Sequence, residues 1–402
     1  MISNRVKYYK KHNGYNMKIK KIYLSIFGSG LGHATRIKPI YEILQKEGHI
    51  IQASSFGEGF EFLKNDGVNC KRVPEIDVSW KDDGSVSPNR TLLKLPKNII
   101  IFIIHIFLEF ILISKFKPDI IISDSRLSSI IVSRIMRIRS ITILNQIKIK
   151  MPNNKDRKLI SVIERFQTRM LVFLWSMSDK IVIPDLPPPY TISKYNMVEE
   201  HRINKKLQYI GLIVKKNTGV DSVELIRKMN IEKNKRTIFF QISGPKNSNT
   251  EIVKKIKNNL DSISEEYNII ISAGNLGRNN QPKKIGNIWF FEWCDITNEL
   301  IIESDIIITR GGHSSISKAL NFGKPIISIP INNHTEQINN ARTVEEMGLG
   351  MKLDESDISY RSLKNSIEYI LKNDKFKINI EKYLEICDKY NSIQLILEEI
   401  NN

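Results

Sequence analysis

The sequence predicts an α/β protein with two domains, each built on a mainly parallel sheet covered by helices. Short β-branched runs alternate with segments of helical periodicity, which is typical of such sheets. The alternation breaks off near residues 213–225 and then begins again. A chain of 402 residues exceeds one ordinary domain and suits two domains of roughly 200 residues each.

The first half of the chain carries the elements of the first predicted domain, residues 18–212. Apolar runs predict strands at 22–27, 50–54, 119–123, 140–144 and 180–183. Helical periodicity predicts helices at about 34–47, 58–65, 97–115, 126–136 and 157–177. Residues 1–17 are basic and precede the first strand, and we expect a disordered extension there.

The second half of the chain repeats the alternation after a polar linker, residues 213–225. The second domain is predicted over residues 226–375. Its strands are expected at 237–242, 268–272, 287–290, 306–308 and 326–331, with helices at 250–259 and from residue 313. A last helix, near 377–398, belongs to a terminal segment, residues 376–402.

The stretch at 305–341, DIIITRGGHSSISKALNFGKPIISIPINNHTEQINNA, carries the most information about function. Gly311 and Gly312 let the chain turn sharply and bring bare backbone close to a ligand. Residues 313–315 then open a helix whose first N–H groups lack partners and attract an anion, so a diphosphate would fit there. The turn alone is equally consistent with ordinary strand–turn–helix packing. The polar loop after the next strand offers side chains suited to sugar hydroxyl groups.

A second glycine-containing motif, IYLSIFGSGLGHATRIKPIYEILQKEGHII, occupies residues 22–51. Gly28, Gly30 and Gly32 form a flexible loop between a predicted buried strand and a helix. The spacing differs from the dinucleotide fingerprint G-x-G-x-x-G, because His33 stands where the third glycine would be. We therefore do not expect a bound dinucleotide.

The two motifs together resemble nucleotide-sugar glycosyltransferases of the GT-B fold, which have two Rossmann-like domains facing each other across a cleft. The donor-binding half of that family has a G-x-[ST]-rich turn, then A-x-x-x-G-x-P, then [DE]-Q-x-x-N-A. These elements read here as residues 312–315, 319–325 and 336–341. Within that fold the chain resembles the peptidoglycan N-acetylglucosaminyltransferase, the plant and macrolide UDP-glycosyltransferases, and archaeal relatives with a GLGHATR motif. In that fold the last helix crosses back to the first domain.

His33 is the predicted catalytic base. It sits where a glycine loop meets a helix N-terminus, which would keep the imidazole neutral, as a general base requires. It matches the catalytic or acceptor-contacting histidine of the family. The alternative is a purely structural role, in which His33 only packs against the loop. Asp124, at the end of a strand in PDIIISDSR, resembles the aspartate that orients this histidine in plant-type enzymes. Asp124 could equally cap the following helix.

The resemblance also implies a donor site and an acceptor-side loop. Ser243 and Gly244 match a loop that faces the donor phosphates, and residues 291–296 match a segment that reads the nucleobase. Arg310 is a candidate to neutralise a phosphate or to pair with a carboxylate. The predicted donor-binding residues are Ser243, Gly244, Trp293, Ile296, Arg310, Gly311, Gly312, His313, Ser314, Ser315, Lys318, His334, Glu336, Gln337 and Asn340, and those of the acceptor-side loop are Gly28, Gly30, Gly32 and Thr35.

Lys318 departs from the family pattern. The family usually has a glutamate at this position, which accepts from both ribose hydroxyls, and a lysine can only donate. This substitution puts UDP itself in question. It leaves room for another nucleotide, for an extra phosphate contact, or for a protein that has lost catalysis.

Charge and apolar patterning raise the question of a membrane surface. The net charge is +18, which reflects either an Ile-, Asn- and Lys-rich composition or attraction to anionic lipid headgroups. The apolar run at 99–113, IIIFIIHIFLEFILI, is too short and interrupted to predict a membrane span. Lys94, Asn98, His105 and Glu109 fall on one face of the predicted helix. Such a helix is either core or a monotopic membrane contact.

Other features narrow the function further. No nucleic-acid module is recognisable, and the basic residues are dispersed. The three cysteines are widely separated, which favours a reducing compartment, and no secretory signal is evident. We therefore expect a cytoplasmic protein, peripheral on the inner face of the cell membrane if the charge serves lipid binding. Asp82-Asp83-Gly84 follows no buried strand, so it is not predicted to bind a metal.

The resemblance implies an inverting, metal-independent transfer of a sugar from a nucleoside diphosphate, most simply UDP, to an acceptor hydroxyl. No cofactor is expected, and a lipid-linked or glycan acceptor fits the family. Two alternatives remain open. A nucleotide-sugar 2-epimerase of the same fold would use the same phosphate turn, and a non-catalytic sugar-nucleotide binding protein would agree with Lys318.

Overall fold

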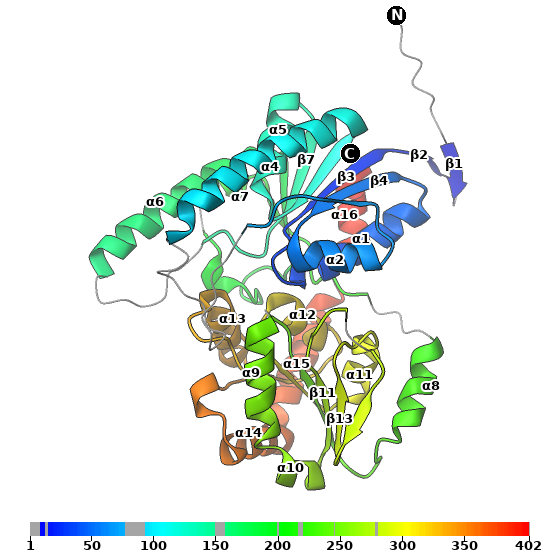
Figure 1. Ribbon diagram of the computed structural model, residues 1–402, viewed down its shortest axis with the longest axis vertical. Helices are drawn as coiled ribbons and strands as arrows, with labels where there is room; N and C mark the ends of the chain where they lie inside the picture. The colour runs from blue at the N-terminus through cyan, green and yellow to red at the C-terminus, as the bar shows by residue number, and fades with distance from the viewer. Residues whose placement is uncertain are drawn as a thin grey trace, which may run out of the picture.

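The computed structural model describes residues 9–12, 15–76, 93–148, 157–198, 201–215, 220–244, 246–277 and 280–401. Two α/β domains lie one above the other, as Figure 1 shows. Each contains a seven-stranded sheet, with the strand orders β5-β4-β3-β6-β7-β8-β9 and β12-β13-β11-β10-β14-β15-β16. Both sheets are parallel except for the pairing of β12 with β13. The predicted fold class is confirmed.

The first domain alternates strands and helices as the sequence predicts. Its strands are β3 (Lys21–Ile26), β4 (Ile50–Ser55), β5 (Cys70–Arg72), β6 (Ile120–Asp124), β7 (Arg139–Ile143), β8 (Lys180–Ile183) and β9 (Leu207–Tyr209). Its helices are α1 (Gly32–Lys46), α2 (Gly57–Asn65), α4 (Leu95–Phe116), α5 (Leu127–Met136), α6 (Arg157–Trp175) and α7 (His201–Asn204), with a 3₁₀ turn at Lys194–Asn196. The sequence prediction missed the short edge strands β5 and β9, since three residues are too few to show a period.

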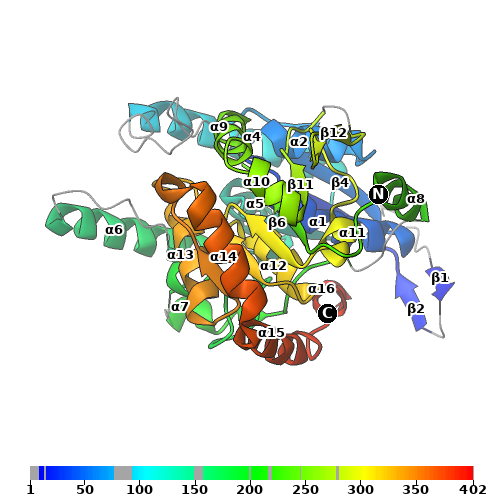
Figure 2. The same ribbon diagram turned by 90° about the horizontal axis from the view of Figure 1, so that it is seen from below.

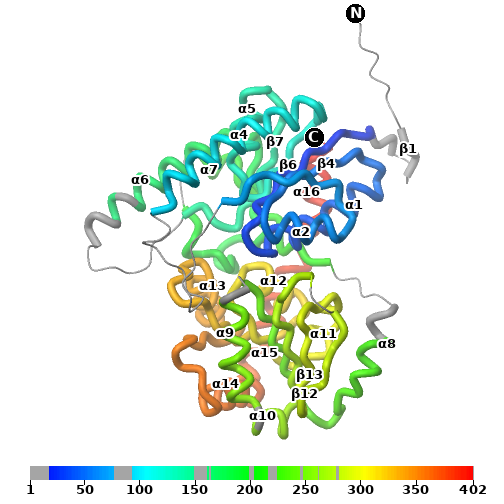
Figure 3. The backbone as a smooth tube through the Cα atoms, viewed as in Figure 1, coloured from blue at the N-terminus to red at the C-terminus, as the bar shows by residue number. Residues whose placement is uncertain are grey.

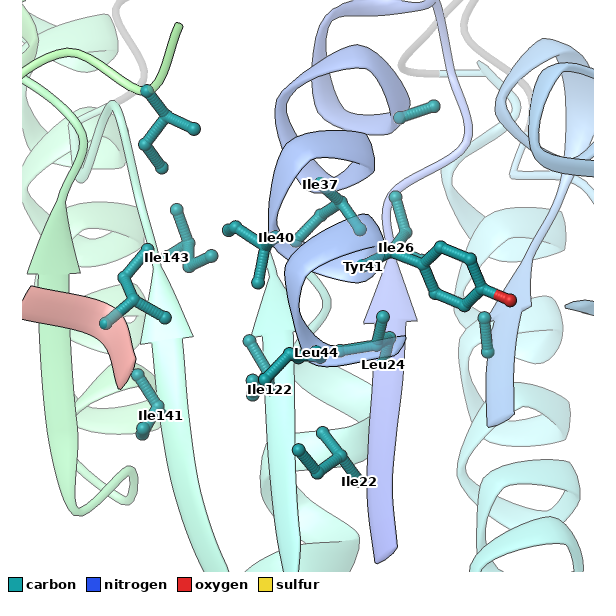
Figure 4. Close-up of a cluster of buried hydrophobic side chains, with 14 of the residues drawn as sticks. Ile22, Leu24, Ile26, Ile37, Ile40, Tyr41, Leu44, Ile122, Ile141 and Ile143 are labelled. Carbon is teal, nitrogen blue, oxygen red and sulfur yellow. The ribbon is translucent and has the colours of Figure 1, made fainter. Parts of the chain in front are cut away.

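The core of this domain lies between the sheet and helix α1. Alternate residues of β3, among them Ile22 and Leu24, point to the same face of the sheet and pack against Ile37 and Leu44 of α1. Figure 4 shows this cluster between the helix and the strands. The opposite face packs against α4, α5 and α6. Helices therefore cover both faces, as parallel sheets require.

The second domain repeats the plan. Its strands are β10 (Thr237–Gln241), β11 (Asn268–Ser272), β12 (Lys283–Ile285), β13 (Ile288–Phe291), β14 (Ile306–Thr309), β15 (Ile326–Ser328) and β16 (Gly350–Lys352). Its helices are α8 (Val220–Met229), α9 (Lys246–Lys257), α10 (Asp261–Glu266), α11 (Thr297–Glu303), α12 (His313–Asn321), α13 (Thr335–Glu346), α14 (Tyr360–Lys372) and α15 (Asp374–Cys387), with a 3₁₀ turn at Glu355–Asp357.

Three boundaries differ from the sequence prediction. Helix α8 begins at Val220, inside the predicted linker 213–225. The predicted helix 377–398 is two helices, α15 and α16 (Ser392–Asn401), because the chain turns between them. Strands β1 (Tyr9–His12) and β2 (Tyr15–Lys18) form a two-stranded antiparallel sheet in the extension for which we expected disorder.

The C-terminal helix α16 returns to the first domain. Ile396 and Ile400 belong to the core that β3 and α1 build, and Glu399 pairs with Lys180 at 2.8 Å. The tube in Figure 3 shows the red C-terminal end among the blue N-terminal elements. Seen from below in Figure 2, α15 leads out of the second domain toward α16. The final helix therefore ties the two domains together.

Candidate active site

A cavity of about 740 Å³ lies between the two domains, a size suited to a small-molecule ligand. Its walls include the loop after β3, the start of α1, and the starts of α11 and α12. Ligands of parallel α/β sheets bind at this carboxyl edge of the strands. The hydroxyl of Ser314 donates to the carbonyl of Gly32, 3.1 Å away, so the two glycine turns touch across the cavity.

The structure brings most of the predicted site residues to this cavity. Those that line it are Gly30, Gly32, His33, Thr35, Ser243, Gly244, Trp293, Gly312, His313, Ser314, Ser315, Lys318, His334, Glu336 and Gln337. Six predicted residues do not line it: Gly28, Asp124, Ile296, Arg310, Gly311 and Asn340. Each of these six has a partner or a packing role elsewhere.

His33 and Asp124 form a pair at the edge of the first domain. His33 is the second residue of α1, Asp124 is the last residue of β6, and the pairing of β3 with β6 brings them together. The His33 Nδ1 atom lies 2.7 Å from an oxygen of Asp124. The carboxylate is fully buried and the imidazole is partly exposed. Asp124 therefore holds one ring nitrogen, and no hydrogen bond to the other ring nitrogen is found among the described residues.

Arg36 is a third member of this group. Its Nε donates to one oxygen of Asp124 at 2.9 Å, and its Nη2 lies 2.5 Å from the other oxygen and 2.9 Å from His33 Nδ1. Burial by itself raises the pKa of Asp124, but the charges of Arg36 and His33 outweigh burial and lower that pKa to about 2. The aspartate is therefore ionised throughout the physiological range.

The start of α12 forms the opposite wall. Gly312 caps the helix in an extended conformation, and a Cβ atom placed there would meet no atom within 4 Å. The hydroxyls of Ser315 and Ser243 are 3.5 Å apart. The open backbone at this helix end can receive an anion.

His313 has a different orientation from the one that a donor contact needs. Its Nε2 lies 3.2 Å from Asp185, in the loop after β8 of the first domain, and its Nδ1 lies 3.4 Å from the hydroxyl of Ser317. Both ring nitrogens are engaged within the protein. His313 can therefore offer the donor its backbone N–H, while its ring joins the two domains.

The structure corrects the predicted donor site at Arg310 and Asn340, which do not line the cavity. Arg310 is fully buried and pairs with Glu355 at 2.6 Å, the carboxylate alternative for this residue. Asn340 is fully buried and donates to the carbonyl of Gly311, 3.3 Å away. Neither side chain lines the cavity, because Arg310 pairs within its own domain and Asn340 bonds both Gly311 and, across the domain boundary, Asn196 at 3.3 Å.

The predicted polar loop after β15 is largely the helix α13. His334 caps this helix, and burial lowers its pKa, which favours the neutral imidazole. Glu336 accepts from Asn145 across the cavity at 2.9 Å. Gln337 accepts from the backbone N–H of Ile331 at 2.9 Å. Within this group, Glu336 has a carboxylate, which can accept hydrogen bonds from the hydroxyl groups of a sugar.

Three further predicted residues serve packing. A Cβ atom at Gly28 would lie 1.8 Å from the carbonyl oxygen of Phe56, so close backbone packing requires glycine there. Gly311 has φ of 76° and its Cβ would lie 2.9 Å from the carbonyl of Gln337. Ile296 packs in the core of the second domain. These positions shape the turns without facing a ligand.

Lys318 lies half-buried in the cavity wall, one turn beyond the start of α12. Burial lowers its pKa, with Glu299 acting in the opposite direction. No hydrogen bond or ion pair to Lys318 is found among the described residues. Its ammonium group is therefore available to a ligand.

Sequence reasoning missed several cavity residues, notably Arg36, Lys38, Asn145 and Glu299. Arg36 lies three positions after His33, on the same face of α1, so helical spacing could have identified it. Asn145 follows β7, beside the strand that ends at Asp124, so the carboxyl-edge rule could have identified it. Lys38 and Glu299 had no comparable signal.

Metal binding has no candidate cluster in the described part of the chain, where no three His, Cys, Asp or Glu side chains are grouped suitably. The Asp82-Asp83-Gly84 motif and Pro245 of the predicted phosphate loop lie outside the described residues.

Comparison with protein families gives two matches. Residues 20–177 match the glycosyl transferase family 1 model, and residues 225–394 match the glycosyltransferase family 28 C-terminal domain. An uncharacterized glycosyltransferase of Methanosarcina acetivorans is 27% identical over 94% of this chain and 98% of its own length. The UDP-N-acetylglucosamine–N-acetylmuramyl-(pentapeptide) pyrophosphoryl-undecaprenol N-acetylglucosamine transferase of Geobacillus kaustophilus is 28% identical over 44% of this chain and 51% of its own length.

Comparison with solved structures shows the same architecture. Spinosyn rhamnosyltransferase SpnG in complex with thymidine diphosphate has a TM-score of 0.67 and 13% identity, covering 96% of this chain and 100% of its own. Spinosyn forosaminyltransferase SpnP has a TM-score of 0.65 and 13% identity, covering 95% of this chain and 99% of its own. The likeness extends over both domains.

Proposed function

We propose that this chain, which is a glycosyltransferase of the GT-B fold, moves a sugar from a nucleoside diphosphate to an acceptor hydroxyl held between its domains. One observation carries the proposal. The His33–Asp124 pair and the open N-terminus of α12 face the same cavity from opposite domains, and Ser314 and Gly32 join their loops. A base and an anion site are the two parts that such a transfer needs.

The proposed chemistry begins at His33. The imidazole nitrogen not held by Asp124 accepts the acceptor's proton while the hydroxyl oxygen attacks the anomeric carbon. The bond from that carbon to the diphosphate oxygen breaks, and its electrons leave with the diphosphate. Attack opposite the leaving group inverts the anomeric centre. Asp124 stabilises the imidazolium that forms, because its carboxylate stays ionised.

The departing diphosphate gains negative charge, and the second domain offers positive charge in the same place. The N–H groups of His313 and Ser314, the first two residues of α12, lack helical partners, and Lys318 adds an ammonium group from the cavity wall. We propose that these groups stabilise the leaving group without a metal ion. Transfer by the purified protein should then persist in excess EDTA.

The donor class is supported by two relatives. SpnG is known in complex with thymidine diphosphate, and the Geobacillus protein is named for UDP-N-acetylglucosamine as donor. We propose a nucleoside-diphosphate sugar, with UDP as the first nucleotide to test. The name of the Geobacillus protein also contains a pyrophosphoryl-undecaprenol acceptor, which supports a lipid-linked or glycan acceptor here.

The first experiment measures thermal stabilisation of the purified protein by UDP, GDP, dTDP and CDP sugars. A ligand that binds only the folded state raises the midpoint of unfolding by mass action. We expect a selective rise with one nucleotide and a smaller rise with its nucleoside, since the nucleoside lacks the diphosphate. No rise with any of the sugars would argue against the donor site.

A further inference from the structure

The strongest feature outside the cavity is an apolar face on three helices of the first domain. Helices α4, α5 and α6 cover one side of the sheet, and Figure 2 shows α4 and α6 reaching the left side of the view. Large apolar side chains on them are 40–71% exposed. We call this set the apolar face: Leu95, Ile99, Ile100, Ile103, Ile104, Phe107, Phe110, Ile111, Ile135, Val162, Phe166, Met170 and Phe173.

On helix α4 the usual distribution of side chains is reversed, with polar residues facing the protein and apolar residues facing outward. Its buried residues are His105, Glu109 and Ile113, so two of the three groups that it turns toward the protein are polar. Glu109 pairs with the buried Arg126 at 2.5 Å and accepts from Ser54 at 2.8 Å. His105 Nε2 lies 2.6 Å from the carbonyl of Pro74. These contacts fix the rotation of the helix, so its apolar side stays outward.

This arrangement also limits what the helix can do in a membrane. By length and composition, Leu95–Phe116 could cross a bilayer. Crossing would place the buried Glu109–Arg126 pair and the sheet contacts in lipid, which is costly for polar groups. A helix that lies in the interface with its outer side in the acyl region keeps every one of these contacts.

The charges around the apolar face match an anionic lipid surface. Lys115 and Lys117 lie at the C-terminal end of α4, Arg134 and Arg137 at the end of α5, and Arg169 within α6, and all five are exposed. On the three helices the described acidic side chains are Glu109, which is buried, and Glu164, which is half-buried on α6. Basic side chains beside an apolar surface attract anionic headgroups, by about 1 kcal/mol each.

We propose that the apolar face of α4, α5 and α6 binds an anionic bilayer surface and holds the enzyme as a monotopic protein. The apolar side chains enter the boundary between headgroups and acyl chains, and the neighbouring lysines and arginines contact the headgroups. This proposal is independent of the identity of the sugar donor, because the binding surface lies outside the cavity.

The test is flotation of the full chain with vesicles of phosphatidylcholine, alone or with part replaced by phosphatidylglycerol. We expect binding to the anionic vesicles that exceeds binding to the neutral ones. Phe107→Asp and Phe166→Asp should each lower the ratio of bound to free protein at least about tenfold. Each removes the favourable transfer of a phenylalanine side chain from water into the bilayer. Ile378→Asp on α15 is the matched control, because Ile378 is 48% exposed in the other domain.

A second readout does not depend on a disruptive substitution. A polarity-sensitive fluorophore on Phe107→Cys should shift to the blue with anionic vesicles, and the same label on Ile378→Cys should not. Two results would overturn the proposal. One is vesicle binding unchanged by both aspartate variants. The other is absence of binding to anionic vesicles, and a dimer in solution that Phe107→Asp dissociates would then assign the face to a second copy of the chain.

Discussion

His313 and Asp185 meet across the domain boundary, with Nε2 of the histidine 3.2 Å from the carboxylate, although 128 residues separate them. The same carboxylate accepts from the backbone N–H groups of Leu186, Ile192 and Ser193. One buried side chain thus organises the loop after β8 and fixes the start of α12, which carries the proposed anion site.

Replacing Asp185 by alanine should therefore destabilise the protein strongly. Three buried N–H groups and the His313 ring would lose their partner, and we expect the free energy of unfolding to fall by about 3 kcal/mol. Denaturant unfolding measures the change. Asp179→Ala is the matched control, since Asp179 is exposed and accepts from one backbone N–H, that of Ser140. An equal loss in both variants would contradict this role for Asp185.

His33→Ala should remove catalysis while sparing donor binding. Loss of a general base lowers kcat by about 100- to 10,000-fold. Release of nucleoside diphosphate from the donor, with a lipid extract as the acceptor source, measures turnover, and calorimetry measures donor affinity. Gln45→Ala, exposed on the same helix, should match the wild type. Turnover retained in His33→Ala would exclude His33 as the base.

Asp124 should make stability depend on acid pH. Its pKa in the folded protein, about 2, lies below the ordinary value of 3.8, so the charged form stabilises the fold above pH 4. That contribution, roughly 2 kcal/mol, is lost as the pH falls from about 4 through 2. The difference in unfolding free energy between wild type and Asp124→Asn should shrink over this window. A difference that stays constant with pH would show that the ionised carboxylate contributes nothing.

Two glycines should respond to alanine in opposite ways. Gly28→Ala forces a Cβ onto the Phe56 carbonyl, so unfolding should become easier by several kcal/mol, as expected for overpacking. Gly312→Ala meets no protein atom and should leave stability within about 1 kcal/mol. Its methyl group would instead occupy space at the proposed phosphate site and weaken nucleotide binding. Unchanged nucleotide affinity in Gly312→Ala would place the phosphates elsewhere.

Lys318→Gln should weaken a nucleoside diphosphate more than its nucleoside. The lysine lies five residues from His313, about 7.5 Å along the helix axis. At that distance and an effective dielectric constant near 20, one pair of unit charges contributes roughly 2 kcal/mol, or about 40-fold in affinity for the diphosphate. Calorimetry with UDP and uridine measures the contrast. Equal losses for both ligands would assign Lys318 to the ribose.

Much of the fold was predictable, because it depends on local signals. The β-branched runs mark the central strands, and Gly30, Gly32 and Gly312 mark turns that border the cavity. The family resemblance suggested Asp124 as the partner of His33, and the register of β3 beside β6 brings the two side chains within 2.7 Å. The segment that carries His334, Glu336, Gln337 and Asn340 was predicted as a loop, because sparse apolar residues hide the helical period of α13.

The sequence by itself determined the two-domain α/β architecture, the glycine turns and the residue types available to the site, since periodicity and turn chemistry act over a few residues. Only the tertiary structure decided how buried polar groups are paired. Arg310 pairs with Glu355, 45 positions away, and His313 contacts Asp185 of the other domain. The buried pair of Glu109 with Arg126 orients α4 so that its apolar side faces outward. Such choices follow from packing, because a buried charge or hydrogen-bonding group must find its partner among residues distant in sequence.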